Sequence, residues 1–498
     1  MVEHRFRKAR VVGSNPISGS TPSGAPCIRG ARCVPGRSSR ARACGVPAAR
    51  RDCIALAQVL FRPYPAAMLS LPLLLAVAPL SFSQPTVAAR PGIEEEPTRA
   101  DLTAEAVRIL LGSSEQYEPD PPVGRLRPDR LAPWQAEERE RLAALTVEAG
   151  TTGREWPYEG VYRVRPDGRI PGGYRVGGTS IAAEALLLAP GLDAARREQI
   201  ARATRFVLEA LAEDPTLASF VDRQGRERRS PDHRSYDVRG WGHTYALSLL
   251  LRLLEEGGAD AELGVAARAA VPGLLEALVA GEGKGGGWNY ASGATASPFQ
   301  TGATLLVLYR AVAQGFAVDE PMIVRALDAL ERGRREDTGA WSYSVRPGQK
   351  GHNEAMNGSS ARAAVAELAL LLGGRSSVER LRVAVDGFFL GWEDLLARKS
   401  QQGTHEGPYG IAPYYFFFGH GYAALAIEGL PEAERPPLRE QLLERLVRTR
   451  EEAGGWNDRV FPRTRSYGTA MALRALLAPE APEHPRWSAA PAEGGEGE

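Results

Sequence analysis

Two of the seven histidines hold equivalent places in the sequence, and these places suggest chemistry. His243 and His420 each follow a glycine directly and precede an apolar helical segment. The N-terminus of a helix disfavours the imidazolium cation, so a neutral histidine there can act as a general base or bind an anion. Thr179, Ser359 and Thr469 hold the same place in other segments, where they would cap a helix. A catalytic base and a capping residue both remain open.

Acidic side chains occur in loops near the same segments. Glycoside hydrolysis uses two carboxylates about 5–10 Å apart, and the loop acids that suit it are Glu354, Glu406, Asp237 and Asp458. For each of them a solvated loop acid is the alternative. The catalytic candidates from the sequence are His243, His420, Glu354, Glu406 and Asp237.

Aromatic residues gather just before the apolar segments. Candidates for ligand contact are Trp288, Tyr290, Trp341, Tyr343, Tyr409, Tyr414, Tyr415 and Trp456. Such rings stack against sugars or hold an apolar chain. The three tryptophans share a Gly-Gly/Ala-Trp turn, and this repetition also suits a structural task, in which each indole fills the gap between its own pair of helices.

These residues fall on a pattern that recurs six times. A glycine followed by a small or polar residue and an apolar run stands at intervals of 64, 60, 56, 61 and 49 residues. The copies begin at Gly178, Gly242, Gly302, Gly358, Gly419 and Gly468. Each opens a helix that is apolar nearly all round, which is typical of a buried helix. Amphipathic helices are expected between the copies, at residues 194–211, 262–279, 321–332, 378–396 and 438–450.

The alternation of buried and amphipathic helices predicts an all-α fold with two concentric rings, an α6/α6 toroid built as a barrel of six helical hairpins. An open solenoid of hairpins is the alternative. The Gly-Gly-Trp turns and Gly-Thr/Ser helix starts resemble the repeats of the squalene cyclase and protein prenyltransferase family, within the terpenoid cyclase-like superfamily. The resemblance covers about residues 150–478 and implies an α/α toroid that holds an isoprenoid chain in its central cavity.

The known chemistries of that family do not transfer to this chain. Its cyclases use an Asp-x-Asp-Asp motif and its prenyltransferases hold zinc partly through cysteine, but the motif is absent and all four cysteines lie within residues 1–53. We therefore expect a toroid that binds a small-molecule, isoprenoid or glycan ligand, with no metal and no cofactor. A carbohydrate-active hydrolase or lyase and a divergent terpenoid cyclase-like enzyme are the alternatives, and whether the protein is an enzyme stays open.

Charge and composition divide the chain. Residues 1–67 hold 12 basic and 2 acidic residues without apolar periodicity, which is typical of a disordered or non-native leader. Residues 68–83 have the apolar core and small-residue end of a signal peptide, so we expect a secreted or periplasmic protein. Residues 84–150 are expected to be a linker with N-terminal helices, 151–478 the toroid and 479–498 a disordered tail. Neither nucleic-acid binding nor a transmembrane helix is expected.

Overall fold

The computed structural model describes residues 97–117, 153–158, 170–217, 219–221, 227–229, 238–257, 260–290, 295–345, 355–401, 405–459, 461 and 463–488. All of these belong to one compact unit, Arg90–Glu498. The predicted leader and signal peptide lie outside the described residues. Helices dominate the unit, and the prediction of an all-α fold is confirmed. One short antiparallel pair, β1 (Ser219–Val221) and β2 (Glu227–Arg229), was not expected.

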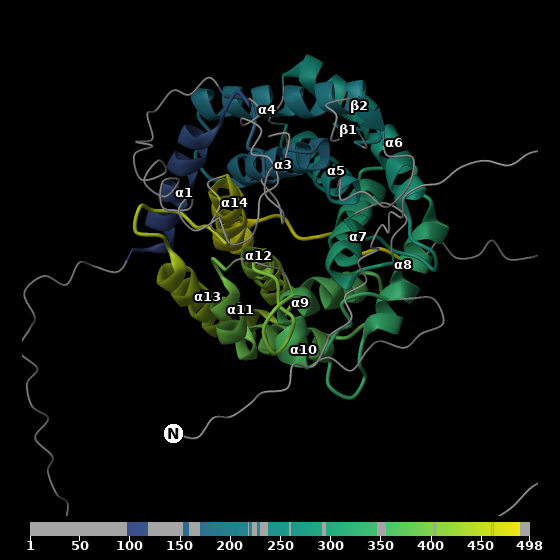
Figure 1. Ribbon diagram of the computed structural model, residues 1–498, viewed down its shortest axis with the longest axis vertical. Coiled ribbons are helices and arrows are strands. Elements are labelled where there is room, and N and C mark those ends of the chain that lie inside the picture. Colours follow the sequence, from purple (N-terminus) through teal and green to yellow (C-terminus); the bar gives the residue numbers. More distant parts are fainter. Residues whose placement is uncertain are drawn as a thin grey trace, which may run out of the picture. The chain divides into compact units, whose positions relative to one another are not determined.

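The helices that carry the repeat glycines within their first two turns form an inner ring (Figure 1). They are α3 (Gly172–Leu188), α5 (Arg239–Glu256), α7 (Pro298–Ala313), α9 (Met356–Leu372), α12 (Tyr415–Glu428) and α14 (Thr464–Leu477). Each packs against the next, and α14 returns to pack against α3. Their residues are buried on nearly every side, as apolar all-round helices must be. The ring is thus closed, and the α/α toroid is confirmed over the open solenoid.

Amphipathic helices form the outer layer, as the sequence predicts. They are α1 (Arg99–Ser113), α4 (Ala194–Glu213), α6 (Ala261–Gly281), α8 (Glu320–Gly333), α10 (Val378–Leu390) and α13 (Arg435–Thr449). The expected helix at 378–396 ends at Leu390, and a short α11 (Trp392–Arg398) follows it. Helix α1 packs on α14, so the start of the described chain covers the helix that closes the ring. Because segments such as 118–152 are not described, the number of hairpins stays a prediction.

Two further features bear on the predictions. Helix α6 is long and apolar enough to cross a membrane, and 33% of its most apolar window is buried within the protein. At the other end of the chain, the turn η3 (Ala478–Glu480) leads into a segment that crosses the ring towards α7 (Figure 1). In this segment Trp487 stacks on Tyr309, with ring centroids 6.2 Å apart, and donates its backbone N–H to the Leu372 carbonyl. The tail predicted to be disordered is therefore packed over residues 481–488. A further turn, η2 (Glu432–Glu434), precedes α13.

Candidate functional site

Three tryptophans are held in the same way between an outer and an inner helix. Trp156, Trp288 and Trp456 each donate the indole N–H to a carbonyl at 2.8 Å and the backbone N–H to a threonine hydroxyl at 2.9–3.1 Å. The carbonyls belong to Leu110, Leu278 and Leu446 on the outer helices, and the hydroxyls to Thr179, Thr301 and Thr469 on the inner helices. Each indole thus joins one outer helix to the following inner helix.

The repeat glycines allow this arrangement. A Cβ added to Gly178 would lie 2.5 Å from the Trp156 carbonyl oxygen, and one added to Gly468 would lie 2.5 Å from that of Trp456. No real Cβ tolerates such a distance, so glycine at the helix start lets the tryptophan segment cross it closely. The residue two positions after each tryptophan therefore lies near the N-terminal end of the inner helix.

That place faces the centre of the ring. Tyr158 follows Trp156 by two residues and Tyr290 follows Trp288 by two, and both line one pocket at the N-terminal ends of the inner helices. The pocket has a volume of about 390 Å³, including open space at its mouth. Its lining is aromatic or aliphatic throughout, formed by Tyr158, Tyr174, Val238, Trp241, Tyr290, Phe299, Tyr414 and Tyr467.

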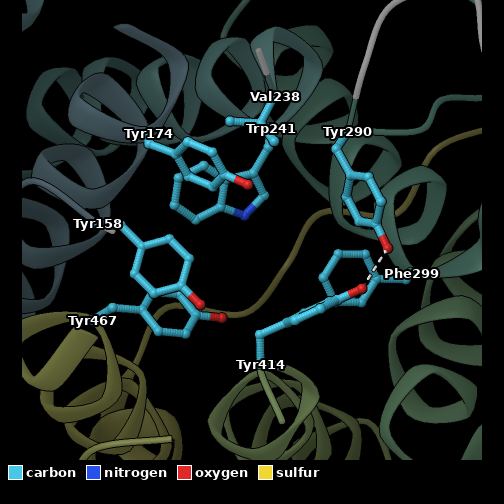
Figure 2. A pocket seen from close by; sticks show the side chains of 8 residues that line it. All are labelled: Tyr158, Tyr174, Val238, Trp241, Tyr290, Phe299, Tyr414 and Tyr467. Atoms are coloured by element: carbon cyan, nitrogen blue, oxygen red, sulfur yellow. Dashed lines mark hydrogen bonds between the residues drawn. The ribbon is translucent and has the colours of Figure 1, made fainter. Parts of the chain in front are cut away.

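The rings form two groups on opposite sides of this pocket (Figure 2). In the first group Tyr158 packs against Tyr174, Trp241 and Tyr467 with centroid distances of 4.6–5.8 Å. In the second group Tyr290 packs edge-on against Phe299 at 5.7 Å, and its hydroxyl bonds those of Tyr343 and Tyr414 at 2.7 and 3.1 Å. Burial raises the pKa of Tyr290 and of Tyr414 well above 10, so these phenols are neutral.

Polar groups lie further along the same inner helices, beyond the residues that line the pocket. Tyr245 lies one turn after Trp241 on α5, and its hydroxyl bonds that of Tyr422 on α12 at 2.9 Å, across the ring. Deeper still, Glu184 accepts hydrogen bonds from Ser248 at 2.8 Å and from Arg474 at 3.1 Å. The apolar cavity therefore occupies only one end of the ring.

The third residue that follows one of these tryptophans by two positions is Asp458, which was expected from the sequence to be a loop acid. It is not among the residues that line the pocket. It follows Trp456 by two residues and is fully buried. Neither carboxylate oxygen has a hydrogen-bond partner among the described residues. Burial raises the pKa of this carboxyl to about 7, although Arg459 and Lys399 act in the opposite direction.

The two histidines are not brought together. His243 places Nε2 at 3.0 Å from the Pro215 carbonyl oxygen, beyond the end of α4. His420 accepts the indole N–H of Trp392 at 2.9 Å and places Nδ1 at 2.8 Å from the Phe416 carbonyl oxygen. Burial lowers the pKa of His420 to about 4, so it is neutral. Neither lines the pocket, and a catalytic role for either stays a prediction.

The acidic candidates are scattered or not described. Asp237 and Glu354 lie outside the described residues. Glu406 is exposed and forms an ion pair with Arg398 at 3.6 Å. In the part of the chain that the structure describes, no group of three histidine, cysteine or acidic residues is placed to hold a metal ion.

Of the predicted ligand contacts, the structure brings Tyr290 and Tyr414 into the pocket. Tyr343 bonds the Tyr290 hydroxyl through its own hydroxyl. The Tyr415 ring packs against Phe299, with ring centroids 5.2 Å apart. Tyr409 is 40% exposed. Trp288, Trp341 and Trp456 are buried and do not line the pocket, so their position matches the structural alternative.

The sequence prediction missed most of the first ring group. Trp156 and Tyr158 were overlooked because 23 residues separate Trp156 from its threonine, whereas 13 separate Trp288 and Trp456 from theirs. The spacing Trp-x-Tyr, shared with Trp288 and Tyr290, was the signal that would have found them.

Known structures show similar arrangements of helices. The scan against family models and the search of curated proteins both found no match. Among solved structures, an inactive variant of the α-1,6-mannanase GH76A of Salegentibacter sp., in complex with α-1,6-mannotriose, has 13% identity and a TM-score of 0.39, covering 69% of this chain and 99% of its own. A type II terpene cyclase from Scytonema, in complex with geranylgeranyl dihydroxybenzoate, has 15% identity and a TM-score of 0.37, covering 70% and 100%. A reducing-end xylose-releasing exo-oligoxylanase has 15% identity and a TM-score of 0.39, covering 70% and 93%.

Proposed function

We propose that this protein binds a largely apolar small molecule in the aromatic cavity of its toroid. The observation that carries the proposal is the pocket lining, in which seven aromatic rings and one valine converge from separate elements of the ring. Pockets whose apolar walls converge from several elements are the usual form of a small-molecule site. Helices that are merely packing would fill this space with their own side chains.

The lining favours an isoprenoid-like chain over a glycan. A sugar requires several hydrogen-bonding groups around its ring. In the lining, the hydroxyls of Tyr290 and Tyr414 are already bonded to each other, and that of Tyr158 has no partner among the described residues. Val238 also lines the pocket with φ of +48°, in the left-handed region that β-branched residues rarely adopt. Such strain gathers at ligand sites, where the surrounding structure holds it in place.

Two variants of the same helix test this proposal. Phe299 and Tyr309 are both buried on α7, but only Phe299 lines the pocket. We expect Phe299→Leu to weaken binding of a polyprenyl alcohol at least tenfold, and Tyr309→Leu to leave it within twofold. Quenching of the intrinsic tryptophan fluorescence, to which Trp241 in the pocket wall contributes, measures binding. Circular dichroism checks folding. Equal effects of the two variants, or tighter binding of an oligosaccharide than of the alcohol, would contradict the proposal.

A second candidate, an acid-initiated isoprenoid cyclase, is favoured by Asp458. A carboxyl whose pKa stands near 7 is half protonated at neutral pH and can donate a proton. Incubation with a linear polyprenyl epoxide would give cyclic products by mass spectrometry, and these would vanish in Asp458→Asn. Linear substrate recovered unchanged from the parent protein would exclude this candidate.

The hydrolase alternative and export are left without support from the described residues. No carboxylate is among the residues that line the pocket in the described part of the chain, and a glycosidase needs two. Secretion rests on residues 68–83, outside the described residues, and remains a proposal.

A further inference from the structure

We propose that the ligand of the aromatic pocket carries a positively charged alkylammonium group, with Asp458 as its counter-ion and the surrounding rings as its cage. This inference rests on the proposed function and adds the charge of the ligand to it. Three independent features support it: the place of Asp458 in the repeat, its lack of partners, and the arrangement of the rings.

The repeat places Asp458 beside the pocket. Trp156, Trp288 and Trp456 have the same two hydrogen bonds with nearly the same lengths, so the residue two positions later leaves each one in an equivalent way. In two units that residue is Tyr158 or Tyr290, and both line the pocket. In the third unit it is Asp458. Only this position of the series exchanges a phenol for a carboxylate.

Asp458 also lacks the partners that a buried acid normally has. Its side chain is 0% exposed, and neither oxygen has a hydrogen-bond partner among the described residues. Buried carboxylates are generally paired, because an unpaired charge in an apolar interior is strongly disfavoured. A site that keeps such a group is prepared for a ligand that supplies the missing charge.

The charged neighbours of Asp458 do not supply a close partner. Lys399 is bound to Glu451, with Nζ–Oε1 at 2.6 Å. The Arg459 guanidinium lies over the Phe461 ring, 5.0 Å from its centroid. Asp458 also interacts with the phenols of Tyr158 and Tyr467, whose pKa values are raised first by burial and next by the Asp458 charge. Both phenols line the pocket, so Asp458 acts on the cavity through its wall.

The rings supply the second half of a cation site. The group around Tyr158, Trp241 and Tyr467 faces the group around Tyr290, Phe299 and Tyr414 across the cavity (Figure 2). The faces of aromatic rings carry negative potential and attract an ammonium group that has lost its water. An aromatic cage beside a buried carboxylate therefore selects an alkylated cation over a neutral molecule of equal shape.

The experiment compares choline with its neutral isostere, 3,3-dimethylbutan-1-ol, by isothermal titration calorimetry on the full chain. We expect choline to bind at least tenfold more tightly than the alcohol at pH 8, where Asp458 is ionised. In Asp458→Asn we expect this preference to fall below threefold while the affinity for the alcohol is unchanged. Glu367→Gln, which alters a buried acid bonded to Arg334 away from the pocket, is the matched control and should keep the preference.

The outcomes separate this inference from the proposed function. If the alcohol and choline bind equally well, or Asp458→Asn keeps the preference, the inference is overturned while an apolar binding site stands. If neither probe binds and a polyprenyl alcohol fails as well, both proposals fall. Loss of the preference in Glu367→Gln would also overturn the inference, because the effect would then not be specific to Asp458.

Discussion

Glu184 and Asp458 are both buried carboxylates of the same ring, and their surroundings differ in every respect. Glu184, deep on α3, is 1% exposed and is bonded to Ser248 and Arg474, with Arg310 at 3.5 Å. Burial would raise its pKa, but Arg474 and Arg310 outweigh burial and the pKa is lowered. Asp458 lies at the aromatic end of the ring with no hydrogen-bond partner for its carboxylate among the described residues, and burial raises its pKa to about 7.

By this difference, Glu184 is an acid that holds the structure together, and Asp458 is one that can serve a ligand. At the inner end of the ring each charge is matched by another, as with Arg252 and Glu255 at 2.7 Å, and the crossing segment with Trp487 covers this region. At the aromatic end, Asp458 is buried behind the apolar wall, and its carboxylate has no hydrogen-bond partner among the described residues. Matched charges hold helices together, whereas an unmatched charge weakens the fold and is kept where it serves a ligand.

The largest effect is expected from Glu184→Gln. The substitution leaves Arg310 and Arg474 buried without their shared carboxylate, so we expect the free energy of unfolding to fall by about 3–5 kcal/mol. Denaturant titration measures it. The control is Glu336→Gln, which breaks an exposed ion pair with Arg380 and should cost less than about 1 kcal/mol. Equal losses in the two variants would remove the distinction between a matched buried acid and a surface one.

Asp458→Asn should raise the free energy of unfolding rather than lower it, and the size of this effect should depend on pH. The folded-state pKa of about 7 lies above the ordinary value of 3.8, so the parent protein loses stability as pH rises from about 4 to 7, by roughly 3–4 kcal/mol. The variant has no such group. Its stability relative to the parent should therefore increase across this range, as measured by urea unfolding at pH 4.5 and 8. A difference that stays constant with pH would show that Asp458 has an ordinary pKa.

The threonines that accept the backbone N–H groups of the three tryptophans should stabilise the fold. Thr301 accepts the Trp288 backbone N–H at 2.9 Å and donates to the Trp288 carbonyl at 3.0 Å. We expect Thr301→Val to lower the unfolding free energy by about 1–3 kcal/mol, because a buried N–H loses its acceptor. It should also weaken ligand binding, since these bonds hold the segment that carries Tyr290. Thr338→Val at an exposed position is the control. Equally small losses of unfolding free energy in the two variants would contradict a stabilising role for the Thr301–Trp288 hydrogen bonds.

The smallest effect is expected from Tyr245→Phe. This variant removes one hydrogen bond across the ring, to Tyr422, and should cost about 1 kcal/mol. Thermal unfolding of this variant and of Tyr409→Phe, at an exposed position, provides the measurement. If the two melt alike, the Tyr245–Tyr422 hydrogen bond contributes nothing to stability, which contradicts the prediction.

The sequence predicted the helices well because their periodicity records burial directly. The amphipathic segment expected at 194–211 is α4, Ala194–Glu213, and the one at 262–279 is α6, Ala261–Gly281. Helix starts depend on local hydrogen bonds: α1 is capped by Thr98, and Asp101 completes the capping box from inside the helix. The pocket lining was harder to predict. A helix that is apolar on every side has no periodic pattern to indicate which of its faces lines the cavity.

The site itself depends on contacts between distant residues, which a single sequence does not record. Tyr158 and Tyr467 are 309 positions apart and lie with ring centroids 4.6 Å apart only because the ring closes. His243 and His420 share a repeat position, but each forms a different hydrogen bond, which the spacing of the repeat does not predict. Asp458 was recognised as a loop acid, but its burial followed only from the fold.

Direct titration of the Asp458 carboxyl tests the central claim, that this buried acid lacks a hydrogen-bond partner in the described part of the chain. Carboxyl carbon NMR on labelled protein, with the resonance assigned through Asp458→Asn, would follow its ionisation in the free protein and with choline bound. The account predicts a midpoint near pH 7 in the free protein and a clear decrease when the cation is present. A midpoint close to 4 in the free protein, unaffected by choline, would contradict it.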